Sequence, residues 1–393
     1  MKSFKYWKDA LIDYIYRLKF AISKNYFYHS KVENKIVFAN FNGRGYGDNP
    51  KYIAEEIINQ GLPFDLVWLT RNISDPMPSR VRKVSFYSIK AVKELSSAKI
   101  IINNVKNGLP YMKKKNQYYI QTWHGSFALK YVEGELGNRL SKKYIIDSKK
   151  DSKSIDLLLS GCTLDSCIFK ESFWYSGEIF EKGLPRNDIY FRPSNKIISR
   201  IKKILNIPND VKIALYAPTF RDDWSIDAYN LDTALLKRTL ENKTGEKWSV
   251  VIKLHPNISL GTMNHGYSEN IIDGSIISDS QELFLSSDLL ITDYSSVVYD
   301  FAIMHKPVFL FATDLEKYAK TRGLRPEYYD LPFAFCQSNH ELFDAIQKTD
   351  FKQYVEIANR FFKFTICSFD DGRASKSVVD RIKVIMCGET ILK

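Results

Sequence analysis

The stretch ITDYSSVVYDF, residues 291–301, decides the fold. Apolar residues 289–292 lead into Asp293 as a buried parallel strand would, and after residues 294–296 apolar residues recur at helical spacing. A strand, a short polar turn and a helix start form a common phosphate site of α/β proteins, because free backbone N–H groups point at the anion. Ser295 and Ser296 would add hydroxyl donors. The structural alternative is that these serines only cap the helix.

Outward from this stretch, strands alternate with helices along most of the chain, which indicates parallel, doubly wound sheets. At 393 residues the chain exceeds one ordinary core, so two domains are expected. A basic helix over residues 194–210 ends in INIPND and predicts the entrance to the second domain. The main expected strands are residues 35–40, 64–70, 99–103, 118–123 and 157–160 in the first domain, and 211–217, 248–254, 274–278, 289–292 and 306–311 in the second.

Composition limits the class of protein. A hydrophobic fraction of 45% indicates a folded globular chain, and a net charge of +12 favours anionic partners such as phosphorylated substrates or acidic lipid head groups. No zinc-finger spacing or RNA-binding aromatic signature is present, so nucleic acid ranks last. Five cysteines without a close CxxC pair indicate reduced thiols in a cytoplasmic protein. No signal peptide and no uncharged run of about 20 residues is evident.

Residues 1–30 predict an amphipathic helix rich in aromatic and basic residues, typical of a helix that lies in a membrane interface. The alternative is a helix packed on the protein's own core. A basic run over residues 139–153 is usually a solvated helix face, but beside a cleft it would also suit lipid phosphates.

Three stretches in the first half of the chain contain candidate binding or catalytic residues. A loop with three glycines, FNGRGYGDNP (41–50), joins a strand to a helix and would let backbone N–H groups approach an anion, although its spacing is not that of a dinucleotide site. His124 follows a strand and precedes Gly125, at the sheet edge where ligands of α/β proteins bind, so we expect it to accept a proton. Arg186, in GLPRND, is a candidate phosphate contact; the alternative is a surface arginine.

In the second half, Arg221 and His255 follow two strand ends, as Ser295 and Ser296 do. Two sheets facing across a cleft would bring these residues opposite His124. No dense carboxylate cluster is present, so we expect no resident metal and no cofactor, although phosphoryl chemistry often recruits Mg²⁺.

Four motifs, QTWHGS (121–126), YAPTFRDD (216–223), KLHP (253–256) and ITDYSSVVYDF, occur in an order that resembles the CDP-glycerol glycerophosphotransferase family of teichoic acid primases and polymerases, which includes ribitol-phosphate transferases. GDNPKYI (47–53) and GLPRND (183–188) are similar to further motifs of that family. One departure is Ser-Phe-Ala-Leu-Lys after His-Gly, where the family commonly has Thr-Pro-Leu-Lys, which leaves acceptor contacts there open.

The resemblance implies a GT-B-like α/β fold, with two Rossmann-like domains facing across a cleft and an N-terminal amphipathic helix. The expected divisions are a membrane-associating helix (1–30), an acceptor domain (31–192), a CDP-alditol-binding domain (193–345) and C-terminal helices that cross back to the first domain (346–393). Some polymerases of the family carry a long N-terminal extension that this sequence lacks, so we expect a primase or a compact polymerase.

The implied activity is transfer of glycerol phosphate or ribitol phosphate from a CDP-alditol to a hydroxyl of an undecaprenyl-diphosphate-linked saccharide or growing polymer, with release of CMP. The implied place is the inner face of the bacterial membrane. In the family pattern His124 is the base and His255 binds the pyrophosphate. The expected substrate-binding residues are Asn49, Lys51, Gly125, Arg186, Thr219, Arg221, Lys253, Asp293, Ser295, Ser296 and Asp300.

Three alternatives stay open from sequence. A GT-B glycosyltransferase using a nucleotide sugar would share the fold and the phosphate loop. A membrane-surface scaffold could keep the fold without the chemistry, and a nucleic-acid-binding protein would show steeply salt-dependent affinity. The choice between glycerol and ribitol, between primase and polymerase, and the oligomeric state are not decided by these motifs.

Overall fold

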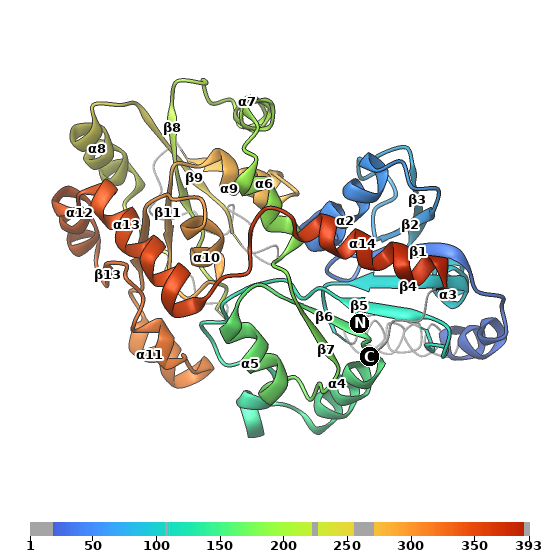
Figure 1. Cartoon of the computed structure of the whole chain (residues 1–393). Coiled ribbons are helices and arrows are strands. Elements are labelled where there is room, and N and C mark those ends of the chain that lie inside the picture. The colour runs from blue at the N-terminus through green and yellow to red at the C-terminus, as the bar shows by residue number, and fades with distance from the viewer. Residues whose placement is uncertain (1–18, 107–108, 110, 222–226, 255–270, 389–393) are drawn as a thin grey trace, which may run out of the picture.

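The computed structural model describes residues 19–106, 109, 111–221, 227–254 and 271–388. Within them the chain forms two parallel sheets, each covered by helices on both faces (Figure 1). We name the seven-stranded sheet and its helices the first lobe, and the six-stranded sheet and its helices the second lobe. In Figure 1 the second lobe lies on the left and the first lobe on the right.

The first sheet has the strand order β3-β2-β1-β4-β5-β6-β7, and all its strand pairs are parallel. Its central strands are continuous apolar runs because both faces are buried under helices, as in KIVFA and AKIIIN. The strands are β1 Glu33–Ala39, β2 Asp65–Thr70, β3 Val81–Ser85, β4 Ala98–Asn103, β5 Tyr118–Gln121, β6 Leu157–Ser160 and β7 Glu178–Glu181.

The second sheet has the order β10-β9-β8-β11-β12-β13, again all parallel. Residues 274–278, expected as a strand, do not form one. The strand ends at Asp273, whose side chain accepts a hydrogen bond from Ser275 N at 2.7 Å and turns the chain into a short 3₁₀ helix, Gly274–Ile276. The strands are β8 Lys212–Tyr216, β9 Trp248–Ile252, β10 Ile272–Asp273, β11 Leu289–Thr292, β12 Val308–Phe311 and β13 Phe335–Cys336.

Both sheets share one topology. Numbered within its own sheet, the second sheet has the order 3-2-1-4-5-6 of the Rossmann fold, and the first has the same order with a seventh strand added at the end. The order reverses between β1 and β4 in the first sheet, and between β8 and β11 in the second. Ligands of such sheets bind beyond the carboxyl ends of the strands at this switch point. The loops after β1, β4, β8 and β11 are therefore where binding residues are expected.

Helices cover each sheet face. In the first lobe, α2 (Asp48–Asn59) and α14 (Ala374–Cys387) pack on one face, and α3 (Ile89–Ser97) and α5 (Thr163–Ser172) on the other. In the second lobe the faces are covered by α7 Asn195–Ile204, α8 Thr233–Thr244, α9 Ser280–Ser286, α10 Val297–Ala302, α12 Asn339–Lys348 and α13 Phe351–Phe361. The remaining labelled helices are α4 Lys142–Ser154, α6 Asp188–Phe191 and α11 Leu315–Arg322.

Two terminal segments differ in part from expectation. Residues 1–18 of the expected N-terminal helix lie outside the described residues, and residues 19–28 are helical. Of the tail expected to cross back after residue 346, α13 stays on the second lobe, where Ala358 packs into the core, because its apolar face meets that lobe's own helices. The crossing is made by α14, whose Val378, Val379 and Ile382 join the core of the first lobe beside α2 (Figure 1). Arg381 of α14 also pairs with Glu178 of β7.

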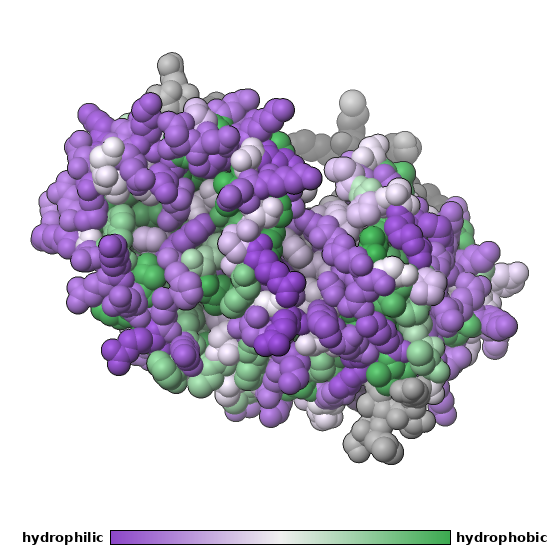
Figure 2. All heavy atoms as spheres, turned by 45° about the horizontal axis from the view of Figure 1, so that its top comes forward, coloured by the Kyte–Doolittle hydropathy of each residue, from purple (hydrophilic) through white to green (hydrophobic). Residues whose placement is uncertain are grey.

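The surface agrees with this division between core and solvent. On the face shown in Figure 2, hydrophilic residues dominate and apolar residues occur in small scattered groups. No helix of the described residues combines the length and the apolar character needed to cross a bilayer.

Candidate active site

The loop after β5 places His124 at the carboxyl edge of the first sheet. The ring nitrogen Nδ1 of His124 lies 2.7 Å from the carbonyl oxygen of Asn104, which follows β4 directly. A carbonyl oxygen can only accept a hydrogen bond, so in the neutral ring Nδ1 carries the proton. The lone pair is thereby left on Nε2. This geometry prepares His124 as a proton acceptor whose ring orientation is set by the neighbouring strand.

The environment of His124 favours its neutral form. Burial lowers the pKa of His124 below its ordinary value, and the charges of Arg186 and Lys130 act in the same direction. The Asn104 carbonyl and Asp48 oppose the shift without reversing it. A neutral imidazole near pH 7 is the form that a general base requires.

The turn after β11 brings the second lobe against this loop. A Cβ atom placed on Gly125 would lie 3.1 Å from the hydroxyl oxygen of Ser296, so the two loops touch where the first has no side chain. Ser295 Oγ accepts a long hydrogen bond of 3.3 Å from Val297 N, whereas the Ser296 side chain does not cap α10. The loop that carries His124 and the Ser295–Ser296 turn thus lie against each other.

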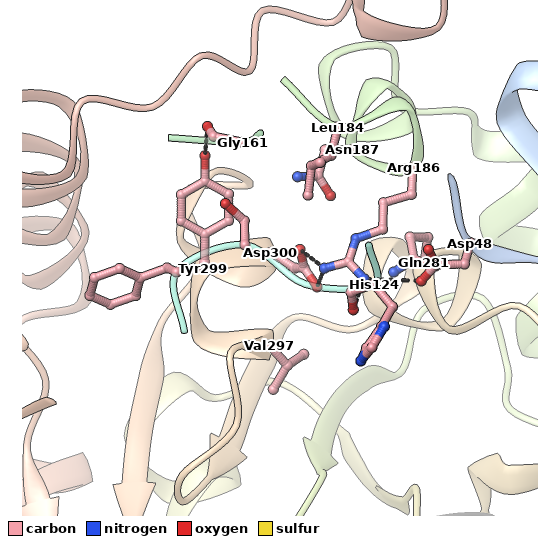
Figure 3. Close-up of polar contacts among 12 residues, drawn as sticks. Asp48, His124, Gly161, Leu184, Arg186, Asn187, Gln281, Val297, Tyr299 and Asp300 are labelled. Atoms are coloured by element: carbon pink, nitrogen blue, oxygen red, sulfur yellow. Dashed lines mark hydrogen bonds and ion pairs between the residues drawn. The ribbon is translucent and has the colours of Figure 1, made fainter. Parts of the chain in front are cut away.

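Arg186 joins the two lobes beneath His124. Its guanidinium donates to Asp48 of the first lobe at 3.0 Å and to both oxygens of Asp300 of the second lobe at 2.9 and 3.0 Å. It also donates to the backbone carbonyl of His124 at 2.8 Å. Figure 3 shows the His124 ring pointing away from this cluster. Arg186 therefore holds the backbone of His124 in place from behind.

The arginine cluster is buried and charged. Only 5% of the Arg186 side chain is exposed, against 7% for Asp48 and 3% for Asp300. Burial raises the pKa of Asp300 to about 6, with Arg186 opposing and Asp48 adding to the rise. The two carboxylates raise the pKa of Arg186 against the opposing effect of burial. Since its charge is already matched by two carboxylates, the direct phosphate contact expected of Arg186 gives way to a structural position between the lobes.

The second switch point is organised around Asp293. This carboxylate accepts hydrogen bonds from Thr219 N at 2.8 Å and from Arg221 at 2.8 Å. Arg221 also pairs with Asp314 at 2.7 Å and lies among three tyrosine rings, Tyr229, Tyr294 and Tyr318. The buried Thr219 hydroxyl has no hydrogen-bond partner in the structure as described. Arg221 and Asp293 thus support the turn.

The other expected residues occupy separate positions. Asn49 is fully buried, and its amide donates to the Trp123 carbonyl at 3.2 Å. Lys51 pairs with Asp279 at 2.5 Å and with Glu282 at 2.9 Å, which is a second ion pair between the lobes. Lys253 donates to the Ile277 carbonyl at 2.9 Å, and burial lowers its pKa to about 8.

His255 lies outside the described residues. In the part of the chain that the structure describes, no three His, Cys, Asp or Glu side chains are arranged to hold a metal ion.

Sequence reasoning missed three residues of the site: Asp48, Asn104 and Asp314. Asp48 lies within GDNPKYI and has a φ of 55°, a left-handed backbone that few residues other than glycine adopt. The sequence does indicate Asn104, because it directly follows an apolar strand that ends at the switch point. Nothing in the sequence indicates Asp314, since its partner Arg221 is 93 residues away along the chain.

Comparison with known proteins gives a consistent set of relatives. A family profile described as CDP-Glycerol:Poly(glycerophosphate) glycerophosphotransferase matches residues 22–384. The chain is 34% identical to the teichoic acid poly(glycerol phosphate) polymerase of Staphylococcus epidermidis, over 88% of this chain and 50% of that protein. It is 31% identical to the teichoic acid glycerol-phosphate transferase of Staphylococcus aureus, over 90% of this chain and 94% of that protein.

A solved structure shares the fold. A variant of the wall teichoic acid polymerase TagF soaked with CDPG superposes with a TM-score of 0.81 at 30% identity, covering 99% of each chain. The present chain nevertheless spans about half the length of the Staphylococcus epidermidis polymerase that it matches.

Proposed function

Because the chain belongs to the CDP-glycerol:poly(glycerophosphate) glycerophosphotransferase family, we propose that it transfers glycerol phosphate or ribitol phosphate from a CDP-alditol to a hydroxyl group. The acceptor is a lipid-linked saccharide or a growing polymer of teichoic acid type, and CMP is released. The observation that carries the proposal is the meeting of His124, with Nε2 free to accept a proton, and the Ser295–Ser296 turn between two Rossmann switch points.

The proposed architecture is GT-B-like. The first lobe, built from residues 31–192 together with α14, presents the acceptor to His124, and the second lobe, built from residues 193–345 together with α13, binds the CDP-alditol. The unpartnered Thr219 hydroxyl and the Ser295 and Ser296 hydroxyls suit the phosphates of the donor. Lys253, which follows β9, adds positive charge at the carboxyl edge of the second sheet. Arg221 is already paired with Asp293 and Asp314, so it positions the turn instead. His255 is assigned to the pyrophosphate from the family pattern alone.

The reaction can be written from these groups. The acceptor oxygen attacks the phosphorus that carries the alditol, its proton passes to Nε2 of His124, and the bond to the CMP oxygen breaks with the electron pair leaving on CMP. Positioning and charge stabilisation supply most of the catalysis of such a transfer. The network of Asp48, Arg186 and Asp300 contributes positioning, because it fixes the lobes and the His124 backbone together.

The proposed location is the cytoplasmic face of the membrane. The helix over residues 19–28 and α4 both carry lysines, among them Lys24 and Lys150. Large apolar side chains are exposed on both helices, with Tyr26 at 75% and Ile146 at 66%. Apolar and basic side chains together suit an anionic lipid surface.

Nucleotide specificity tests the function. We expect CDP-glycerol or CDP-ribitol to protect the protein from thermal unfolding, by about 2.7 kcal/mol at a concentration 100 times the dissociation constant. With a synthetic lipid-linked disaccharide, mass spectrometry should detect added alditol phosphate units and stoichiometric CMP. Protection by UDP- or GDP-sugars in place of the CDP-alditols would indicate a glycosyltransferase instead.

The pH dependence tests the base. Burial lowers the pKa of His124, so we expect the imidazole to become protonated only below about pH 6.5. Once protonated, it can no longer act as the base. We expect kcat/KM to rise with pH along a limb whose midpoint lies below that value, and to stay level through neutral pH. A midpoint above pH 7 would contradict the assignment of this limb to His124.

A further inference from the structure

Two bulky aromatic residues beside His124 have an unusual backbone. Phe41 has a φ of 40° and Trp123 a φ of 52°, both in the left-handed region that aromatic side chains seldom adopt. Phe41 follows β1 and Trp123 follows β5, so both lie at the carboxyl edge of the first sheet. Strained backbone of this kind persists where the surroundings hold it, and it concentrates at functional sites.

Buried amides hold both residues. The Phe41 N–H donates to Asn104 Oδ1 at 2.8 Å, and Asn104 Nδ2 donates to Asn40 Oδ1 at 2.7 Å. Asn104 is the same residue whose carbonyl accepts from His124. The Trp123 N–H donates to Gln121 Oε1 at 3.0 Å. Asn104, which orients the base, therefore also fixes Phe41, and Gln121 fixes Trp123.

Both rings contact the imidazole. The ring centroid of Phe41 lies 5.3 Å from that of His124 in an edge-on arrangement, and the centroid of Trp123 lies 4.1 Å away with a tilt of 37°. Trp123 rests on Phe173, whose ring centroid is 4.8 Å away. Phe41, in contrast, keeps 36% of its surface exposed. An apolar surface open to solvent thus borders the base.

We propose that Phe41 and Trp123 form an apolar subsite that holds the carbon skeleton of the acceptor alcohol beside His124 and disfavours water as the nucleophile. The inference rests on the proposed function and deepens it. An alcohol and water offer the same O–H group, so a site can distinguish them only through the carbon atoms that the alcohol carries. One methylene group in an apolar pocket is worth roughly 10- to 200-fold in discrimination.

Transfer to the alcohol and hydrolysis by water cleave the same bond. In either case the bond between the alditol-bearing phosphorus and the CMP oxygen breaks, CMP leaves with the electron pair, and the nucleophile's proton passes to His124 Nε2. Attack by the alcohol gives a phosphodiester. Attack by water gives free alditol phosphate. The ratio of these products therefore measures the selectivity of the subsite.

Replacing Phe41 with alanine tests the subsite. With CDP-glycerol or CDP-ribitol, whichever the unaltered protein uses, and a synthetic lipid-linked disaccharide, we expect Phe41→Ala to raise the ratio of free alditol phosphate to elongated product about tenfold. The KM for the disaccharide should rise, while that for the donor stays within about twofold. Phe41→Leu, which keeps an apolar side chain, should restore most of the selectivity.

The control is Phe364→Ala, which removes an exposed phenylalanine that follows α13 on the second lobe. It should leave both KM values and the product ratio unchanged. An unchanged product ratio and disaccharide KM in Phe41→Ala would overturn the inference. If that variant does not fold, the polar replacement Phe41→Gln is measured in its place, and the same rise in the product ratio and the disaccharide KM is expected; unchanged values there would overturn the inference. A wild-type protein that releases no CMP from either donor would instead contradict the proposed function itself.

Discussion

His124→Ala is expected to lower turnover by about 10²- to 10⁴-fold, the usual contribution of a general base. Affinity for the CDP-alditol should change little, because the imidazole belongs to the first lobe and its reactive nitrogen faces the acceptor in the proposed reaction. Turnover is measured by CMP release at saturating donor and acceptor, and donor affinity by calorimetry.

The matched control for this variant is His305→Ala. His305 is an exposed histidine of the second lobe whose Nδ1 lies 2.7 Å from Asn359 Oδ1, so it also has one nitrogen engaged in a hydrogen bond. Its removal should leave turnover within twofold. A His124→Ala protein that is as active as His305→Ala would remove His124 from the mechanism.

Arg186→Met is expected to have the largest effect on stability, a loss of about 3–5 kcal/mol in the free energy of unfolding. The substitution keeps the volume of the side chain stem but leaves Asp48 and Asp300 buried without their counter-charge. It also removes the donor to the His124 carbonyl, so turnover should fall as well. The free energy of unfolding is measured by urea denaturation monitored by circular dichroism, and turnover is measured by CMP release.

Two further variants test whether the stability effect of Arg186→Met comes from leaving buried carboxylates unpaired. Arg82→Met removes an arginine that pairs with Asp65 and Glu94 but is 44% exposed, and it should cost less than about 1 kcal/mol. The combined variant Asp48→Asn, Arg186→Met and Asp300→Leu should recover much of the stability, because no unpaired buried charge remains, but not the turnover. Equal stability of Arg186→Met and Arg82→Met would show that the cluster does not hold the lobes together.

The sequence predicted the buried strands well and the edge strands poorly, for a physical reason. β1, β2 and β4 lie inside the sheet and are apolar on both faces, so their runs stand out. β3 reads VRKVS because it is an edge strand whose charged residues face outward, and it was not expected.

The sequence predicted which residues belong to the candidate site better than it predicted the contacts among them. The sequence placed His124 and the Ser295–Ser296 turn at strand ends of two sheets that face each other, which is why they were expected to lie close together. The partners of Arg186 could not follow, because Asp48 and Asp300 are 138 and 114 residues away along the chain. An arginine in a polar loop resembles a phosphate ligand, and only the fold shows two carboxylates already beside it.

The position of α14 has a consequence for biosynthesis. α14, which covers one face of the first sheet together with α2, is the last described helix to leave the ribosome, about 200 residues after β7. At a translation rate of about 5–20 residues per second, the nascent amino-terminal half waits roughly 10 to 40 s with part of that face uncovered. Chaperone capture during this interval is therefore expected at the part of the face that α14 later covers, and a ribosome stalled before residue 374 would expose an aggregation-prone surface.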